Sequence, residues 1–170
     1  MGFVELLKKR AKESVKTIVL PESEDRRTYE AAAQILKEDL ANLIIIGSEE
    51  AVKKGSEGLD VSKATIVDPE KNEKTQAYVD KLVELRAKKG MTPEKARETI
   101  LNDYTYYGVM MVKMGYADGM VGGCTTPTAN LLRPSLQILK TAPDSKLVSA
   151  FFLIIVPDCE YGANGAFVFG

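Results

Sequence analysis

The sequence predicts an α/β protein in which helices flank a mainly parallel sheet, giving a three-layer α/β/α arrangement. Three apolar, β-branched runs of strand length occur in its front part, at residues 17–20, 43–46 and 64–67. Each run ends at a turn signal and is followed by residues with helical spacing. Strands that alternate with helices form parallel sheets through right-handed crossovers. At 170 residues, the chain is long enough to bury a core of this kind.

The expected helices follow from apolar residues that recur every three or four positions and from local start and stop signals. Ser23 or Asp25 is expected to cap the helix after the first strand, and Thr92 with Pro93 starts a later one. Gly90 is expected to end the helix before it. The expected helices cover residues 3–15, 26–37, 49–54, 74–89, a segment from 93, 106–114, and a segment that reaches 139.

Three more segments are expected to be strands. Residues 119–121 form a short one that enters a polar, glycine-rich turn. Residues 147–156 and 166–169 are strongly apolar and are expected to be the opening strands of a second α/β domain. The predicted organisation is a first domain over residues 1–146 and the incomplete start of a second over residues 147–170.

Charge and composition exclude several classes of partner. The chain has 23 lysine and arginine residues against 24 acidic ones, so no long-range field draws it to nucleic acid or to an anionic membrane. Residues 1–10 mix charges among apolar positions, unlike a signal peptide, and the apolar run 148–156 is far shorter than a membrane-spanning helix. We expect a cytoplasmic protein in which any anion site is local.

The sequence contains no histidine, and Cys124 and Cys159 are far apart. This pattern supports neither a zinc-type cluster nor a disulfide framework, so no metal is expected. Because the commonest general base is absent, any acid–base chemistry falls to a carboxylate.

The turn at residues 122–130 is the clearest candidate ligand site. It follows a strand and precedes a helix, and in parallel sheets anions bind where strands end and helices begin. Its glycines allow close backbone approach, and Arg133 on the following helix adds a positive charge. The alternative is that its hydroxyls only cap the helix and that Arg133 pairs with a surface acid. The hydroxyls that could donate to a phosphate are those of Thr125, Thr126 and Thr128.

A second candidate loop covers residues 21–27. It brings Arg26 and Arg27 to the start of a helix, where the helix dipole favours acids instead. These arginines either bind an anion or neutralise the carboxylates beside them. Arg86 lies on a charged helix face, where most arginines are simply solvated. The chain has neither G-x-x-x-x-G-K-[ST] nor G-x-G-x-x-G, so the common nucleotide-binding folds are disfavoured.

Six blocks of sequence, taken in order, resemble the phosphate acetyltransferases. The likeness covers essentially the whole chain. It implies an enzyme of acetate metabolism that reversibly transfers an acetyl group between acetyl phosphate and coenzyme A. It also implies two α/β domains with the active site between them, and a homodimer. The blocks are LPESEDRRT (20–28), YYGVMM (106–111), ADGMVGG (117–123), LRPSLQILKT (132–141), VSAFF (148–152) and VPDCEYG (156–162).

The resemblance also assigns roles to individual residues. Arg27 matches the arginine after the Pro-Glu-x-x-Asp loop, Arg86 that of Glu-Leu-Arg, and Arg133 that of Leu-Arg-Pro. All three are implied to lie at the substrate cleft, Arg133 in a catalytic role and the others binding substrate. In the family mechanism the thiol of coenzyme A attacks acetyl phosphate directly, so no bound cofactor, metal or enzyme nucleophile is needed. The substrate contacts expected of Thr125, Thr126 and Thr128 rest on the pattern of the turn and not on the resemblance.

Two departures from the family pattern matter. Many members carry a His-Ser pair where this chain has Thr126-Pro127. The family chain is also about twice as long, and its proposed catalytic aspartate and a Ser-Arg pair lie in the back portion. We therefore expect little transferase activity from this chain alone, and a fallback base would come from Glu22, Asp25 or Asp118. We also expect self-association or instability, because these aromatics lack core partners: Phe151, Phe152, Phe167 and Phe169.

Two alternatives to a phosphate acetyltransferase remain open. A phosphate butyryltransferase differs in the size of its acyl pocket, which the sequence does not define. A non-catalytic domain that senses acyl-coenzyme A, like the one attached to some malic enzymes, differs in lacking turnover.

Overall fold

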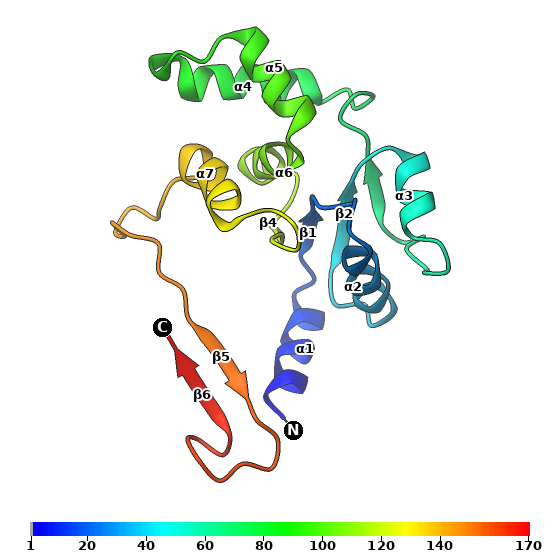
Figure 1. The fold of residues 1–170 in the computed structure, drawn as a ribbon, viewed down its shortest axis with the longest axis vertical. Helices are drawn as coiled ribbons and strands as arrows, with labels where there is room; N and C mark the ends of the chain where they lie inside the picture. The colour runs from blue at the N-terminus through cyan, green and yellow to red at the C-terminus, as the bar shows by residue number, and fades with distance from the viewer. Residues whose placement is uncertain (1) are drawn as a thin grey trace. The chain divides into compact units, whose positions relative to one another are not determined.

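The computed structural model describes residues 2–170, which fold as two compact units. One unit consists of residues 8–140, and the other combines residues 2–7 with 141–170. Figure 1 shows the course of the chain through both units. The boundary expected at residue 146, and the second domain expected beyond it, stay predictions.

The unit of residues 8–140 is built on a parallel sheet of four strands in the order β3-β2-β1-β4, which confirms the predicted fold class. From β1 the chain moves outward to β2 and β3, and then returns to the other side of β1 as β4. The carboxyl ends of β1 and β4 therefore form a topological switch point, where their exit loops diverge and leave a crevice. The strands are β1 (Thr17–Leu20), β2 (Asn42–Ile46), β3 (Thr65–Val67) and β4 (Gly119–Met120).

The helices begin and end close to the predicted positions. Asp25 caps α2, accepting from the Arg27 amide, and Thr92 caps α5 by accepting from the Lys95 amide. The α6 helix begins earlier than predicted, because Asp103 accepts from the amides of residues 105 and 106. The helices are α1 (Phe3–Glu13), α2 (Arg26–Lys37), α3 (Glu49–Gly55), α4 (Thr75–Arg86), a 3-10 turn (Ala87–Lys89), α5 (Pro93–Asn102), α6 (Tyr104–Lys113) and α7 (Thr128–Ile138).

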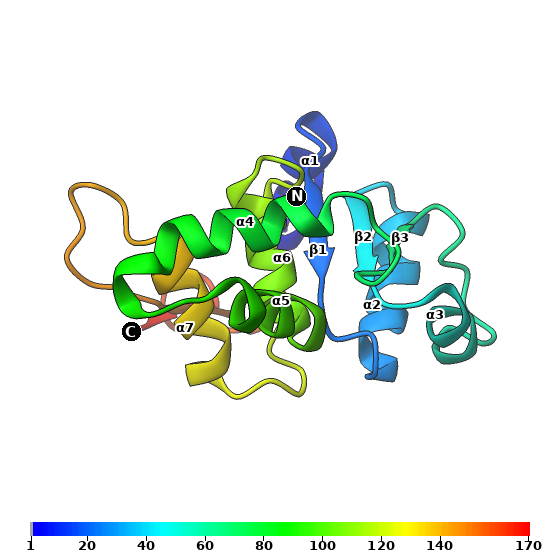
Figure 2. The ribbon, with the colours of Figure 1, turned by 90° about the horizontal axis from the view of Figure 1, so that it is seen from above.

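Two hydrophobic clusters lie on opposite faces of this sheet and form its three layers. Val19, Ile44 and Ile46 point to one face, where they pack with residues of α4, α5 and α6. Leu20 and Ile45 point to the other, where they pack with residues of α2 and α3. This alternation is what a strand covered on both sides requires. Figure 2 shows α4 and α5 lying side by side, away from α2 and α3.

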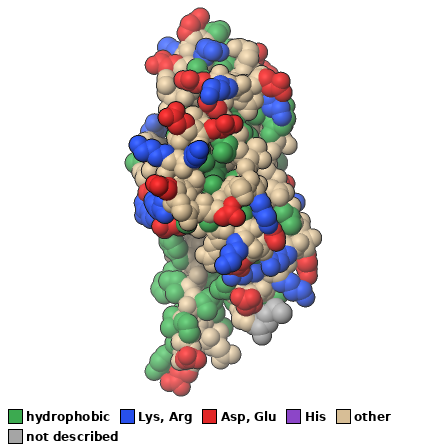
Figure 3. Space-filling model, turned by 90° about the vertical axis from the view of Figure 1, so that its right-hand side faces the viewer, with side chains coloured by type: hydrophobic (Ala, Val, Ile, Leu, Met, Phe, Trp, Pro, Cys, Tyr) green, Lys and Arg blue, Asp and Glu red, His purple; other side chains and the backbone are tan. Residues whose placement is uncertain are grey.

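The other unit contains an antiparallel hairpin of β5 (Phe152–Ile155) and β6 (Ala166–Phe169). The strand predicted over residues 147–156 is shorter than expected, because Phe152 is paired with Phe169 and β6 offers no partner before it. Phe152 is 74% exposed and Phe169 55%, so these aromatics are not in a core. The hairpin shows mainly hydrophobic side chains in Figure 3, whereas lysines, arginines and acids are mixed over the rest of that face.

No helix within residues 2–170 combines the length and apolar character needed to cross a membrane.

Candidate functional site

The candidate site lies at the switch point of the sheet, where two loops leave neighbouring strands. Residues 21–25 leave β1 and lead to α2, and residues 121–127 leave β4 and lead to α7. The sequence predicted both loops as sites without indicating that they meet. They meet because β1 and β4 are hydrogen-bonded neighbours whose carboxyl ends point the same way.

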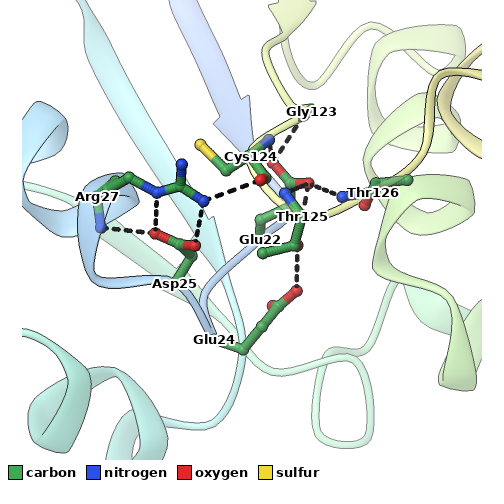
Figure 4. Close-up of polar contacts among 8 residues, drawn as sticks. All are labelled: Glu22, Glu24, Asp25, Arg27, Gly123, Cys124, Thr125 and Thr126. Carbon is green, nitrogen blue, oxygen red and sulfur yellow. Dashed lines mark hydrogen bonds and ion pairs between the residues drawn. The ribbon is translucent and has the colours of Figure 1, made fainter.

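Glu22 ties the two loops together (Figure 4). Its Oε2 accepts hydrogen bonds from the amides of Gly123 and Cys124, at 2.7 and 2.8 Å. Its Oε1 accepts from the amides of Thr125 and Thr126, at 2.9 and 2.7 Å, and lies 3.2 Å from the Thr125 hydroxyl. Four consecutive amides thus converge on one carboxylate, in the arrangement that backbone loops use to hold phosphate.

The charge of Glu22 is stable in this position although the residue is only 2% exposed. Burial raises the pKa of its carboxyl, but hydrogen bonds from the amides of Thr125, Thr126 and Cys124 outweigh burial and hold the pKa at about 2. The carboxylate is therefore ionised at neutral pH. The sequence did not predict the hydrogen bonds to Glu22, because their donors are main-chain amides about a hundred residues away, and every residue type except proline has such an amide.

The glycine-rich turn consequently differs from the predicted phosphate loop. Its amides are already bonded to Glu22, and the Thr125 hydroxyl is shared between Glu22 and Glu24. The hydroxyls do not cap α7, because the cap position is Pro127 and no side chain bonds there. That rules out the helix-capping alternative. A phosphate contact by Thr125, Thr126 or Thr128 stays a prediction.

Arg27 lies beside this network and is itself paired. Its Nε and Nη2 donate to the two carboxylate oxygens of Asp25 at 2.9 and 2.7 Å, and Nη2 also donates to the Cys124 carbonyl at 2.9 Å. The Arg27 guanidinium lowers the pKa of the Asp25 carboxyl, and the carboxylate raises the pKa of Arg27. This ion pair is the neutralisation that the sequence left open as one of two explanations.

A pocket of about 340 Å³ opens next to this ion pair. Apolar side chains, among them Leu20 and Val121, form much of its wall, and Arg27 and Cys124 stand at its polar side. Cys124 is an exposed free thiol. The pocket gives the switch point a concave surface beside a cation.

Arg86 and Arg133 form a second cationic region with a different character. Neither side chain makes a hydrogen bond or ion pair within residues 2–170, and Arg86 Nε is buried without a partner. Burial and the charge of Asp103 raise the pKa of Tyr106, whereas the charges of Arg133 and Arg86 oppose that rise. Both guanidinium groups therefore lie within electrostatic reach of one tyrosine hydroxyl.

Tyr106 also connects this region to α7. Its hydroxyl donates to Gln137 Oε1 at 2.9 Å, one turn along the helix from Arg133. Sequence analysis had not assigned a role to Tyr106 or Gln137. The helical spacing between positions 133 and 137 was the signal that could have linked them.

The carboxylates named as fallback bases are poorly suited to that task. The pKa values of Glu22 and Asp25 are lowered by the contacts described above, so both are weak bases. Asp118 lies at the opposite end of the sheet, where it accepts from the Thr17 amide at 2.8 Å. Within residues 2–170, no group of three or more acidic, histidine or cysteine side chains is arranged to hold a metal ion.

The fold is that of an α/β protein with a parallel sheet, and Arg27 lies beside a pocket at its switch point, the place where open sheets of this class bind ligands. The sequence profile of the family described as "Phosphate acetyl/butaryl transferase" matches residues 2–170. The chain belongs to this family.

The curated relatives are named as phosphate acetyltransferases. The chain is 54% identical over 169 residues to a phosphate acetyltransferase of Acetivibrio thermocellus, and 50% identical over 169 residues to one of Thermoanaerobacterium thermosaccharolyticum. Each match covers 99% of this chain and 51% of the relative. The chain thus spans about half the length of the curated relatives it matches.

Solved structures agree with the fold. A phosphotransacetylase from Streptococcus pyogenes superposes with a TM-score of 0.86 at 35% identity, over 99% of this chain and 51% of that one. The EutD phosphotransacetylase from Staphylococcus aureus gives 0.84 at 35% identity, over 98% and 49%. The predicted resemblance is confirmed at the level of family and fold.

Proposed function

We propose that this chain carries the phosphate- and coenzyme A-binding part of a phosphate acetyltransferase site. The observation that carries the proposal is the pair Arg86 and Arg133, two cations that act on one tyrosine and have no anionic partner within residues 2–170. Arg86 is half-buried, where a cation is less well solvated than in water and a counter-charge stabilises it, whereas Arg133 is exposed and open to a ligand. Arginine suits the phosphate groups of acetyl phosphate and coenzyme A, because its guanidinium donates two parallel hydrogen bonds to their oxygens.

The proposed reaction forms one bond and breaks one. The thiol of coenzyme A loses its proton, and its sulfur attacks the carbonyl carbon of acetyl phosphate to give a tetrahedral oxyanion. The bond from that carbon to the phosphate oxygen then breaks, so that acetyl-coenzyme A and inorganic phosphate leave. Arg133 would stabilise the charge that develops on the oxyanion and on the departing phosphate, while Arg86 holds the substrate and Arg27, already paired with Asp25, makes a smaller contribution.

A non-catalytic function that senses acyl-coenzyme A is a second candidate. It is favoured by the state of the acids at the switch point, since Glu22 and Asp25 are held as weak bases by their hydrogen bonds. In this case the arginines would bind the same phosphates without turnover. The two candidates share the ligand and differ in whether acetyl transfer follows.

Other features of the proposal rest on the family resemblance. They are a preference for acetyl over butyryl groups, a homodimer, a cytoplasmic location, no tightly bound cofactor, and a second domain that begins near residue 147. The apolar hairpin β5–β6 supports the last of these, because its exposed aromatic residues need a covering partner.

The test combines binding with turnover. Coenzyme A affinity is measured by calorimetry on the purified chain, on Arg133→Ala and on Arg10→Ala, which removes an exposed arginine of α1 as a charge control. We expect binding that Arg133→Ala weakens and Arg10→Ala does not. Acetyl-coenzyme A formation from acetyl phosphate, run in parallel with butyryl phosphate, separates the enzyme from the sensing domain. A chain that binds coenzyme A equally well without Arg133 contradicts the proposal.

A further inference from the structure

The Glu22 carboxylate lies where phosphate-binding loops hold an anionic ligand, against the consecutive amides of residues 123–126. Glu22 follows Pro21 at the end of β1 and is almost completely buried. Five donors, four of them consecutive amides, converge on its carboxylate. A buried charge is tolerated only when its hydrogen bonds are made, and here both oxygens are bonded at least twice. The anion that organises this loop is part of the chain itself.

The loop that Glu22 organises is connected to two of the candidate arginines, to Arg133 along the chain and to Arg27 by a hydrogen bond. Thr126 directly precedes Pro127, the N-cap residue of α7, and Arg133 lies on that helix. The Cys124 carbonyl, next to an amide held by Glu22, accepts the hydrogen bond from Arg27 Nη2. A shift of residues 123–126 would therefore move the start of α7 and remove a partner of Arg27 together.

Close packing at Gly122 couples the turn to the end of β1 and to α7. A side chain at this position would come within 3.2 Å of Leu131 on α7, 3.3 Å of Pro21 and 3.5 Å of Glu22 Oε2. The turn, the end of β1 and the first half of α7 thus leave no room for an added methyl group without movement. A shift of the turn would therefore be passed on to Leu131 and to α7.

We propose that Glu22 is a positioning residue for the arginine site. Its carboxylate fills the amide nest of residues 123–126 and so fixes where Arg133 and the Cys124–Arg27 contact lie. This inference rests on the proposed function, because it assumes that these arginines bind a phosphorylated ligand. In this proposal the amides of residues 123–126 bind the Glu22 carboxylate, and the arginine side chains bind the phosphates of the ligand.

A carboxylate that acts by filling a nest can be replaced by a small anion. Glu22→Ala leaves the four amides facing an empty space, which formate is small enough to enter. Formate is preferred to acetate, because acetate resembles the acetyl group of the proposed substrate. Glu22→Gln keeps the buried volume but places an amide nitrogen against two N–H donors, so it provides a second variant if the alanine variant is too unstable to purify. Glu24→Gln is the matched control, since Glu24 bonds only to the Thr125 hydroxyl.

The experiment measures coenzyme A affinity of the full 170-residue chain by calorimetry, with amide hydrogen exchange of residues 123–126 as a direct reading of the nest. We expect Glu22→Ala and Glu22→Gln to speed exchange at these amides and to weaken binding by about tenfold or more. Formate should restore most of the affinity of the alanine variant, while chloride at the same ionic strength should not. Glu24→Gln and the unmodified chain should respond to neither salt.

Three outcomes would overturn the proposal. Faster exchange in both Glu22 variants with unchanged affinity would show that the nest does not position the arginines. Lost affinity that formate does not restore, with exchange raised throughout the sheet, would show a role in stability alone. An unmodified chain that does not bind coenzyme A would contradict the proposed function and leave no site to position. This last failure is distinguishable, because it occurs before any substitution is made.

Discussion

Arg27 and the Arg86–Arg133 pair are both cationic regions of the same unit, but only one of them is neutralised from within. Arg27 makes two hydrogen bonds to Asp25 and a third to the Cys124 carbonyl. Arg86 and Arg133 make no ion pair within residues 2–170, and Arg86 Nε is buried without a partner. The family resemblance implied that all three arginines lie at the substrate cleft, whereas the structure shows that their surroundings differ.

This difference in pairing indicates which arginines gain most from the negative charge of a bound phosphate. A guanidinium that already shares a carboxylate gains little from a phosphate, because that phosphate would repel the carboxylate as well. A guanidinium without a counter-charge gains the full charge-assisted hydrogen bond. We therefore expect the phosphate-binding strength of the site to come mainly from Arg86 and Arg133.

Removing both unpaired arginines should have the largest effect. Two charge-assisted hydrogen bonds contribute roughly 3–6 kcal/mol together, so the double variant Arg86→Ala, Arg133→Ala should bind coenzyme A about a hundredfold more weakly or worse. Calorimetry on this variant is compared with Arg10→Ala, Lys113→Ala, which removes the same charge from exposed positions. A loss of less than about fivefold, or an equal loss in the control, would contradict the contrast between the two regions.

Acid should destabilise the chain through Glu22. The folded pKa of about 2 lies below the ordinary value of 4.5, so the carboxylate stabilises the fold above pH 4.5 and loses this effect as the pH falls toward 2. The shift corresponds to stability on the order of 3 kcal/mol. Urea unfolding at pH 7 and at pH 3 should show a smaller pH dependence for Glu22→Gln than for the unmodified chain. Identical pH dependence in the two proteins would show that Glu22 is not held ionised by the loop.

Arg27→Ala should have a modest effect on ligand binding and a clear effect on Asp25. Without the guanidinium, the pKa of the Asp25 carboxyl should rise toward its usual value, since Arg27 is the main cause that lowers it. Carbon-detected NMR titration of Asp25 measures this change. Arg26→Ala is the control, because Arg26 donates to the carbonyls of Gly55 and Glu57 and not to Asp25. An unmoved Asp25 titration would mean that the ion pair does not form in solution.

Tyr106→Phe should have the smallest effect. It removes the hydrogen bond to Gln137 and should lower the free energy of unfolding by about 1 kcal/mol. Thermal unfolding measures the change, with Tyr161→Phe as the control because Tyr161 is 71% exposed. Equal stability of the two variants would indicate that the Tyr106 hydroxyl does not link α6 to α7.

Much of the fold followed from local pattern. The strands β1, β2 and β3 were predicted within one residue at each end, because their apolar, β-branched runs are unbroken and each ends at a turn signal. The strand at residues 147–156 was predicted too long, because hydrophobicity marks a potential strand while its length depends on a partner that β6 provides for only part of it.

The candidate site followed less from pattern and more from resemblance. Arg86 looked solvated by its neighbours in sequence, and only the family motif singled it out. The role of Glu22 could not be predicted, because its partners are main-chain amides that every residue has. What brings them to Glu22 is the pairing of β1 with β4, which is a property of the whole sheet.

The most direct test compares coenzyme A affinity of Arg133→Ala with that of Arg27→Ala, measured side by side by calorimetry in one buffer. We expect Arg133→Ala to bind about tenfold more weakly than the unmodified chain, and Arg27→Ala to stay within a few-fold of it. Equal losses in the two variants, or a larger loss for Arg27→Ala, would contradict the claim that the unpaired arginines hold the ligand.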